Sequence, residues 1–362
     1  MWSDQRILKL FGIEHPILQA PMAWAQGSAL AIAVSEAGGL GSLPCSLLSA
    51  DQARSELQTL AQHVDKAFNL NFLCYEPPAA DPEIDARWVE RLAGYRAEFG
   101  VEQATLPGAR ASGPSFNETK VRLIEEFPPR VVSFHFGLPQ TALLERVKRT
   151  GACVIASATT VEEARWLEAH GVDAVIAQGA EAGGHRSMFL ADDVTSQPGT
   201  FALVPQIVDA VRVPVIAAGG IGDARGIVAA LALGAAAVQI GTGYLLTPES
   251  TIPQNYRAAL KNAREDQTAI TNVFTGRPAR GIINRAIREI GPMAPEAPGF
   301  PNAMGAMLPL RMQAEAAGSS EFTSLWSGQA ARFARELPAG QLTRELAAGA
   351  LERLRGLGRP CV

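Results

Sequence analysis

Short runs of apolar, often β-branched residues recur along the chain and alternate with stretches whose apolar residues have helical spacing. Most of these runs are continuously apolar rather than alternating, which is typical of parallel strands covered on both faces. Because the predicted strands alternate with helical patterns, we expect a TIM (β/α)8 barrel rather than an open doubly wound sheet. The eight predicted strands are Ile17–Ala20, Gly39–Leu43, Asn69–Leu73, Arg130–His135, Ala152–Ser157, Ala174–Gln178, Val213–Ala218 and Ala236–Gly241.

Two of the predicted helices have recognisable ends. Thr159 or Thr160 can cap the helix after the fifth strand, with a glutamate three residues further on as in a capping box, and Gly171 ends that helix. Asp223 is a plausible N-cap for the helix after the seventh strand, and Gly234 is its expected end.

Two segments interrupt the alternation of strands and helices. The first, 76–128, separates the third and fourth strands. It contains more helical pattern than one barrel helix needs, so we expect an excursion from the barrel at about 76–115. The second, 249–310, holds a Gly/Arg-rich turn and a loop rich in Pro, Gly and Met.

We expect 249–310 to form a small, mainly helical inserted subdomain over the C-terminal face of the barrel, on the substrate side. The barrel itself would comprise 1–248 and 311–362. Two further helices are expected in the last part of the chain, near Ser319–Arg335 and Gln341–Leu357.

Composition and charge exclude several classes of protein. With 47% hydrophobic and 19% charged residues, disorder and coiled coil are excluded. A formal charge of -4 gives no electrostatic reason to expect nucleic acid or an anionic membrane as partner. Proline, glycine and charges interrupt the most apolar stretch, 211–246, so a membrane helix is not expected there. Four scattered cysteines without a Cys-x-x-Cys pair indicate free thiols, and we expect a cytoplasmic protein, either monomer or homodimer.

In a TIM barrel the active site lies at the C-terminal ends of the strands. The last two predicted strands both end in glycine-rich turns, where backbone amides and the dipole of the following helix favour an anion. This pattern predicts a phosphate site, although the same glycines could simply form tight turns. The residues concerned are Gly219 and Gly220 after one strand, and Gln239, Ile240, Gly241 and Thr242 at the end of the next.

Two amide side chains, Asn71 and Gln178, end the third and sixth strands inside apolar surroundings. A buried amide needs partners for its donors and its acceptor. The pyrimidine edge of a flavin offers such partners, and the backbone of a neighbouring loop is the alternative.

His135 ends the fourth strand between two phenylalanines, where partial desolvation would keep the imidazole neutral and suitable as a general base. The alternative is a histidine that satisfies a loop carbonyl. His185, on a glycine-rich loop after the sixth strand, is the competing histidine and could contact cofactor or substrate. We expect no metal site, because metal-ligand spacings such as His-x-x-x-His are missing from the sequence.

An ordered series of motifs resembles the nitronate monooxygenases, formerly called 2-nitropropane dioxygenases. The resemblance runs from about Pro16 to Pro248 and resumes near Leu325–Gln329. Its motifs are Gln19–Ala23, Glu36–Gly41, Asn69–Phe72, Ser133–Gly137, Gln178–His185, Ala218–Ile221 and Gln239–Thr242. Taken singly, only Ser133–Gly137 and Gln178–His185 are fairly specific, whereas the ordered set is strong.

The resemblance implies an FMN-dependent enzyme that oxidises alkyl nitronates, with nitroalkanes as a further candidate, by O2 to a carbonyl compound and nitrite. The family reaction passes through a flavin semiquinone without NAD(P)H, and the family's catalytic histidine matches His135. The implied FMN contacts are the backbone near Met22 together with Asn71, Gln178, Gly183, Gly220 and the Gln239–Thr242 loop.

Two other functions stay open at this point. An FMN-dependent enoyl-acyl carrier protein reductase shares the barrel and the Glu181–His185 type of loop, but needs NAD(P)H. The setting of His135 between phenylalanines favours the nitronate reaction. A barrel that binds a phosphorylated ligand without catalysis belongs to a different class.

Overall fold

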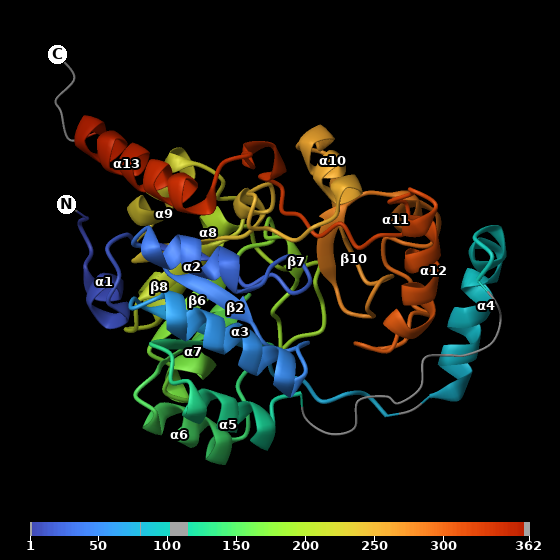
Figure 1. Ribbon diagram of the computed structural model, residues 1–362, viewed down its shortest axis with the longest axis horizontal. Coiled ribbons are helices and arrows are strands. Elements are labelled where there is room, and N and C mark those ends of the chain that lie inside the picture. The colour runs from blue at the N-terminus through green and yellow to red at the C-terminus, as the bar shows by residue number, and fades with distance from the viewer. Residues whose placement is uncertain (1, 80, 102–114, 358–362) are drawn as a thin grey trace.

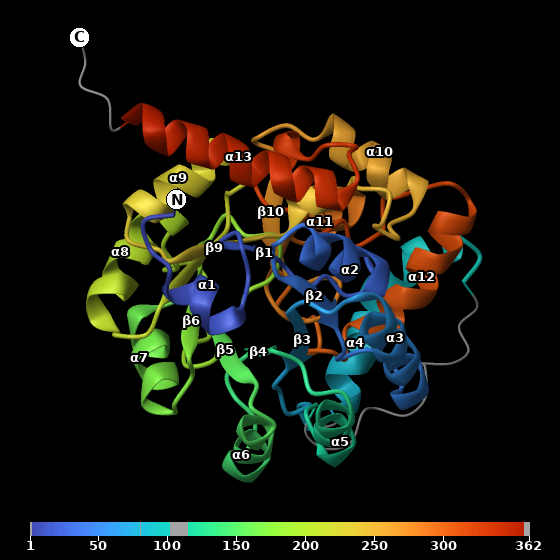
Figure 2. The same cartoon turned by 60° about the vertical axis from the view of Figure 1, so that its left-hand side comes forward.

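The computed structural model describes residues 2–79, 81–101 and 115–357. Eight parallel strands form a barrel surrounded by helices (Figures 1 and 2), which confirms the predicted TIM barrel and all eight predicted strands. The strands are β1 (Ile17–Gln19), β2 (Gly41–Pro44), β3 (Phe68–Leu73), β4 (Val131–His135), β5 (Cys153–Ala158), β6 (Ala174–Gln178), β8 (Val215–Ala218) and β9 (Ala237–Ile240).

The order of the strands is β1-β9-β8-β6-β5-β4-β3-β2, so neighbours in sequence are neighbours in the sheet. A parallel bridge between Leu18 and Leu40 brings β1 and β2 together and completes the ring. Helix α1 (Arg6–Phe11) packs against the N-terminal end of the barrel, where Ile7 and Phe11 are fully buried. The opposite, C-terminal end therefore remains for a site.

Helices on the outside of the barrel bury apolar faces against the strands. They are α2 (Ser28–Glu36), α3 (Ala50–His63), α5 (Glu118–Glu126), α6 (Thr141–Arg149), α7 (Val161–Ala169), α8 (Thr200–Ala210), α9 (Ala224–Ala232) and α13 (Ala339–Leu357). The last of these packs against α9 and α2 and confirms the helix predicted near the C-terminus. The helix predicted near Ser319–Arg335 is wrong, because this segment is irregular except for one turn of 3-10 helix, η2 (Ala331–Phe333).

The predicted helix caps are largely confirmed. Asp223 accepts hydrogen bonds from the backbone of Arg225 and Gly226 at the start of α9. Thr160 caps α7 by accepting from the backbone of Glu163, 3.1 Å away. The reciprocal half of the capping box is missing, since the Glu163 carboxylate instead accepts from the N–H and hydroxyl of Thr159 and from the backbone of Phe189. This buried carboxylate therefore anchors a loop after β6 rather than its own helix.

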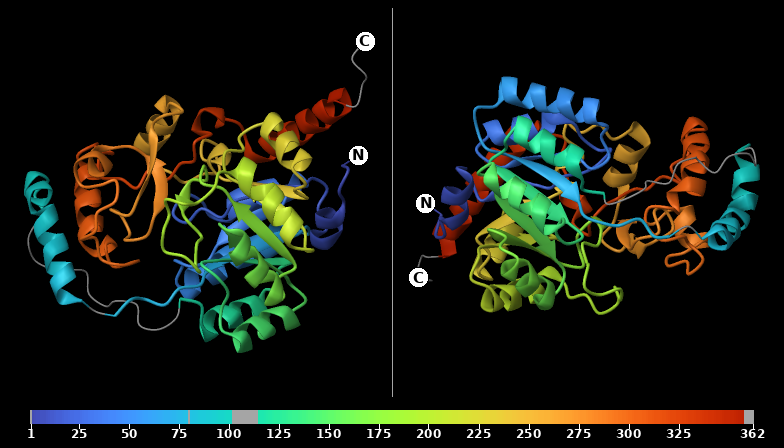
Figure 3. Two further views of the ribbon diagram at one scale, coloured as in Figure 1. Left: turned by 180° about the vertical axis from the view of Figure 1, so that it is seen from behind. Right: turned by 90° about the horizontal axis from the view of Figure 1, so that it is seen from below.

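The two segments that interrupt the barrel pack on each other. Helix α4 (Pro82–Glu98), from the first, lies against α12 (Met304–Ala316), and Figure 3 shows both away from the barrel. The Trp88 indole donates to the carbonyl of Ala303 at 3.1 Å inside a shared apolar cluster. We call this second layer the cap. It consists of α4, α10 (Gln254–Asn262), β10 (Thr268–Thr271), β11 (Ala279–Ile282), α11 (Arg285–Glu289) and α12.

The cap is joined to the barrel by a small antiparallel sheet. Strands β10 and β11 pair with each other, and β11 also pairs with β7 (Gly184–His185) from the loop after β6. The boundary that the sequence suggested between 310 and 311 falls inside α12. The cap therefore includes strand as well as helix, and its strand β11 pairs with β7 from a barrel loop.

The cysteines that the structure describes are free thiols. Cys45 and Cys153 are buried and Cys74 is half-buried, while Cys361 lies outside the described residues. Burial raises the pKa of the Cys45 thiol to about 12, which makes it a poor nucleophile. In the part of the chain that the structure describes, none of the helices has the length and hydrophobicity needed to span a membrane.

Candidate active site

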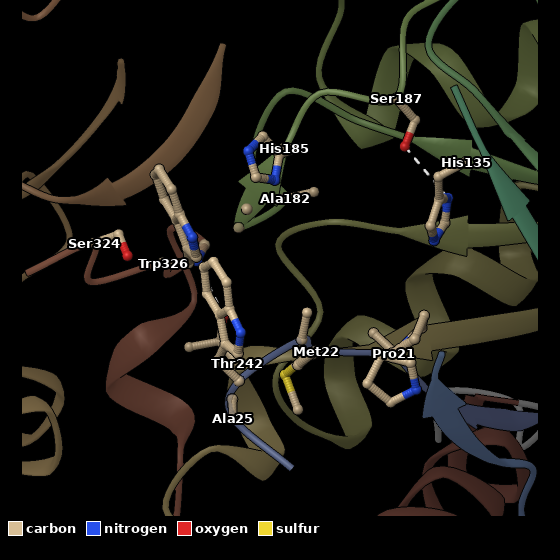
Figure 4. Close-up of a pocket in the computed structure, with 18 of the residues that line it drawn as sticks. Pro21, Met22, Ala25, His135, Ala182, His185, Ser187, Thr242, Ser324 and Trp326 are labelled. Atoms are coloured by element: carbon tan, nitrogen blue, oxygen red, sulfur yellow. Dashed lines mark hydrogen bonds between the residues drawn. The ribbon is translucent and has the colours of Figure 1, made fainter. Parts of the chain in front are cut away.

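A cavity of about 320 Å³ lies at the C-terminal ends of the strands, between the barrel and the cap. The sequence-predicted residues that line it are Met22, Asn71, His135, Gln178, Gly183, His185, Gly219, Gly220, Gln239, Gly241 and Thr242. Ile240 does not line it, because its side chain is buried in the barrel core. Residues from distant turns of the chain thus meet around one space, as Figure 4 shows for part of the wall.

His135 borders the cavity at the end of β4, with its ring tied to the barrel by serines. Its Nδ1 lies 2.6 Å from Oγ of Ser157, on β5, and 3.4 Å from Oγ of Ser187 (Figure 4). Burial lowers the pKa of His135 to about 4, so the imidazole is neutral at pH 7. When Nδ1 carries the proton and donates to Ser157, Nε2 keeps a lone pair that can accept a proton.

His185 faces the same cavity from β7 but is held by the cap. Its Nε2 lies 2.9 Å from Oγ1 of Thr275, and its ring packs edge-on against Phe136 and Phe300. Burial, together with the positive charges of Arg277 and of protonated His135, lowers the pKa of His185 to about 3. The imidazole is therefore neutral too, but its Nε2 is already engaged.

The buried amides differ in how many partners they have. Gln178 donates to the carbonyl of His185 at 3.1 Å and accepts from the backbone of Ser187 at 2.9 Å, so it holds the loop after β6. Asn71 donates to the carbonyl and hydroxyl of Ser133. Gln239 is 8% exposed, and its Oε1 atom has no hydrogen-bond partner within the described residues. Oδ1 of the buried Asn69 is also unpaired, but of these two amides Gln239 is the one that lines the cavity.

The glycine turns after β8 and β9 leave backbone donors beside the cavity. Gly219 and Gly220 have φ angles of 112° and 69°, a left-handed conformation that favours glycine. Among the described residues, no hydrogen bond uses the amide N–H of Gly220 or Gly241. The Oγ1 of Thr242 accepts from the backbone of Gly328 at 3.0 Å. Free amides at two adjacent strand ends form the kind of site that binds a phosphate.

Met22 lies in the loop after β1, with its side chain in the cavity (Figure 4). Its backbone N–H donates to Oε1 of Gln26 at 3.0 Å, so this donor is already used. Gly183 lies against the segment that follows the cap. A Cβ at Gly183 would come within 2.4 Å of the backbone nitrogen of Gly328. This contact requires glycine and joins the loop after β6 to residues 327–328.

A cluster of aromatic side chains on the cap side of the cavity was not predicted from the sequence to be part of the site. It consists of Tyr75, Phe136, Phe300 and Trp326, which all line the cavity. Phe136 directly follows His135 in a strand-end motif, which was the signal that could have identified it. Phe300 lies in the Pro/Gly-rich loop, where no periodic pattern marks any position.

Comparisons with known proteins agree with this geometry. The family model of nitronate monooxygenase matches residues 4–349. A nitronate monooxygenase of Pseudomonas aeruginosa is 43% identical over 356 residues, which cover 97% of this chain and 99% of that protein. The chain belongs to the nitronate monooxygenase family. This confirms the family resemblance and makes the protein a member of a family of flavoenzymes.

Solved structures place this nitronate monooxygenase family member close to other enzymes of the same architecture. The nitroalkane oxidase from Streptomyces ansochromogenes aligns with a TM-score of 0.88 and 39% identity, covering 98% of this chain and all of that one. FabK from Thermotoga maritima aligns with a TM-score of 0.73 and 31% identity over 99% of each chain. Both alignments include the barrel and the cap.

Proposed function

We propose that this protein binds FMN without a covalent link and oxidises alkyl nitronates with O2 to a carbonyl compound and nitrite. The observation that carries the proposal is the neutral His135 at the edge of a cavity that also contains the free amides of the glycine turns. Membership of the nitronate monooxygenase family supports the same reaction.

The residues around the cavity fit FMN. Gly220 and Gly241 would hold the phosphate through backbone N–H groups that have no other acceptor in the described part of the chain. The unpaired Oε1 of Gln239 would accept a hydrogen bond from a hydroxyl or N–H of the bound group. When bound, FMN would supply the redox centre that links the nitronate to O2.

His135 would act on the proton of the substrate. The carbon that bears a nitro group must lose a proton before a neutral nitroalkane becomes a nitronate. Nε2 of His135 would hold that proton in the tautomer in which Nδ1 donates to Ser157, and the 2.6 Å contact between Nδ1 and Oγ of Ser157 would orient the ring. A preformed nitronate already lacks the proton, so its turnover should depend much less on His135.

The overall reaction defines what the cavity must accommodate. One oxygen atom from O2 is added to the carbon, the carbon–nitrogen bond breaks, and nitrogen leaves as nitrite. The second oxygen atom is added in the same way to a second nitronate, so two nitronates and one O2 give two carbonyl compounds and two nitrite ions. Water and ions must stay away from the reacting carbon, and the aromatic side chains of the cap exclude them. Phe136, Phe300 and Trp326 lie on that side of the cavity.

The variant His135→Asn tests the proposal. Turnover of a neutral nitroalkane should fall by about 10²–10⁴, the range expected for loss of a general base, while turnover of its preformed nitronate falls by less than about tenfold. Nitrite release and oxygen uptake measure both reactions. The matched control is His63→Asn, because His63 lies exposed on α3 far from the cavity. Equal losses on both substrate forms would contradict the base role.

A separate measurement tests the cofactor. The purified protein should carry a yellow chromophore that denaturation releases as FMN, and the apoprotein should recover it on addition of FMN. Anaerobic addition of a nitronate should then change the spectrum of the bound flavin. A colourless protein that cannot be reconstituted with FMN would contradict the proposed cofactor. NADH oxidation that requires an enoyl thioester would show that the protein is an enoyl reductase instead of a nitronate-oxidising enzyme.

A further inference from the structure

Phe136, next to the candidate base, has an unusual backbone. Its φ angle is 69°, in the left-handed region that bulky residues rarely adopt. Such a conformation is strained for a bulky residue and persists only when surrounding contacts hold it. It turns the chain directly after β4 and places the Phe136 ring beside His135 in the wall of the cavity.

Contacts on several sides hold the Phe136 ring. The rings of Tyr75, Phe300 and His185 lie 6.5, 5.7 and 6.1 Å from it, between centroids, and all pack edge-on. The guanidinium of Arg277 lies 3.9 Å from its centroid in a cation–π contact. Arg277 is itself fixed, because it donates to the carbonyls of Arg186 and Met188. The ring is therefore a rigid surface rather than an adaptable one.

The wall that Phe136 forms next to His135 is aromatic. Of the described residues that line the cavity, those with charged side chains are Glu181 and Arg311. Arg311 pairs with Glu315 at 2.7 Å, and the Glu181 carboxylate accepts from the backbone and hydroxyl of Thr200. A substrate whose reacting carbon lies at His135 would thus place its organic part against aromatic rings. The charged side chains elsewhere in the cavity, Glu181 and Arg311, already have partners.

We propose that Phe136 is a specificity-determining residue. Its ring, with those of Tyr75 and Phe300, forms the wall that binds the organic part of the nitronate. The substrate class that fits this wall is nitronates with an uncharged alkyl or aryl group of several carbons. The inference rests on the proposed nitronate oxidation and adds which organic group of the nitronate the enzyme prefers.

A series of nitronates of increasing chain length, from ethyl to hexyl, tests the role of Phe136. Each methylene buried against the wall should raise kcat/KM about fourfold, the effect of burying one CH2 group. In Phe136→Ala this gain per methylene should fall to less than about twofold, mainly through KM. The control Phe201→Ala, on a side chain that is 73% exposed, should keep the wild-type slope. Equal slopes in wild type and Phe136→Ala would overturn the inference.

A binding measurement separates this inference from the proposed reaction. Alkanoates are unreactive and their carboxylate has the shape of the nitronate group, so calorimetric titration with butanoate, hexanoate and octanoate reports on the wall alone. Affinity should rise with chain length in the wild type and hardly at all in Phe136→Ala. If the wild type turns over nitronates but alkanoate affinity rises equally with chain length in wild type and Phe136→Ala, the role of Phe136 is refuted and the proposed reaction stands. If the wild type does not turn over nitronates but the rise in alkanoate affinity is lost in Phe136→Ala, the proposed reaction is refuted and the role of Phe136 stands.

A second variant covers the case in which Phe136→Ala does not fold. Tyr75→Ala removes another part of the wall from a half-buried position with an ordinary backbone conformation. It should lower the gain per methylene in both series by at least half. Wild-type slopes in Tyr75→Ala would count against the wall.

Discussion

The barrel side and the cap side of the cavity differ in chemistry. On the barrel side, glycine turns and the amide of Gln239 present polar groups without partners in the described part of the chain. On the cap side, aromatic rings such as Phe300 and Trp326 pack against His185 and make this part of the wall mainly aromatic. Under the proposed function, the polar cofactor would bind on the barrel side, whereas the organic part of the substrate would meet the cap side.

The loop after β6 connects the two sides and is held by buried arginines. Arg186 donates to the carbonyls of Gln178 and Gly179 at 2.9 and 2.8 Å. Arg280, from β11 of the cap, donates to the carbonyl of Ala180 at 2.8 Å. Guanidinium groups satisfy several carbonyls in a fixed geometry. The loop after β6 therefore holds the cap in a fixed position relative to the barrel.

The largest effect is expected when the two sides are forced apart at Gly183. In Gly183→Ala the new Cβ would lie 2.4 Å from the backbone nitrogen of Gly328, and this contact involves backbone that cannot rotate away. We expect the free energy of unfolding to fall by about 1–3 kcal/mol, as for overpacked sites, and FMN affinity to fall at least about tenfold. Urea unfolding and flavin fluorescence titration measure the two quantities.

The matched control for Gly183 is Gly94→Ala. Gly94 lies in α4 with open space around the position of a Cβ. Alanine there should leave FMN binding unchanged and raise stability by up to about 1 kcal/mol. If Gly183→Ala behaved like this control, the tight junction between barrel and cap would have no energetic consequence.

The barrel side could be predicted from sequence because its residues end strands or directly follow them. His135 is the last residue of β4 and Gly219 directly follows β8, so a strand pattern is enough to place both at the C-terminal rim. The partners of Gln178 could not be predicted, because they are backbone groups that β7 brings back toward β6. The Gln178 side chain forms hydrogen bonds with the backbone of the loop after β6. This was one of the two interpretations that the sequence left open, the other being a contact with the cofactor.

The cap side depends on packing between distant segments, which local patterns do not encode. The two interruptions of the barrel were recognised separately, but nothing in either predicts that Trp88 packs in one cluster with Met307. Likewise, Phe300 packs against Tyr75, at 4.8 Å between ring centroids, and Tyr75 lies just after β3, far away in the sequence. A composition rich in Pro and Gly indicates a loop but not the direction of its side chains.

A change of pH should act on both sides through the two half-buried histidines, His135 and His185. The pKa of His135 in the folded protein is about 4, below the ordinary 6.5, so the unfolded chain binds more protons between these values. Stability should therefore fall as pH decreases from about 6.5 to about 4. In His135→Asn the loss between pH 7 and pH 5 should be smaller by about 1–2 kcal/mol.

Urea unfolding at pH 7 and pH 5 checks this expectation, with His63→Asn again as control for an exposed histidine. The same titration predicts that nitroalkane turnover falls as pH decreases through about 4, where His135 becomes protonated and can no longer accept a proton. An identical pH dependence of stability in wild type and His135→Asn would show that the barrel-side histidine is not held neutral by the fold.

The smallest effect is expected from Arg277, the cap residue that contacts Phe136 and lowers the pKa of His185 by its charge. Arg277→Lys keeps the charge but loses the planar stack, so stability should fall by about 0.5–1 kcal/mol while the pKa of His185 stays low. Arg277→Met removes the charge as well, and the His185 pKa should rise. Ring NMR titration distinguishes the variants, with Arg288→Met, on a half-exposed side chain paired with Glu321, as control. An unchanged His185 pKa in Arg277→Met would mean that burial alone keeps the His185 ring neutral. The two histidines would then have low pKa values for the same reason, since burial is also what lowers the pKa of His135.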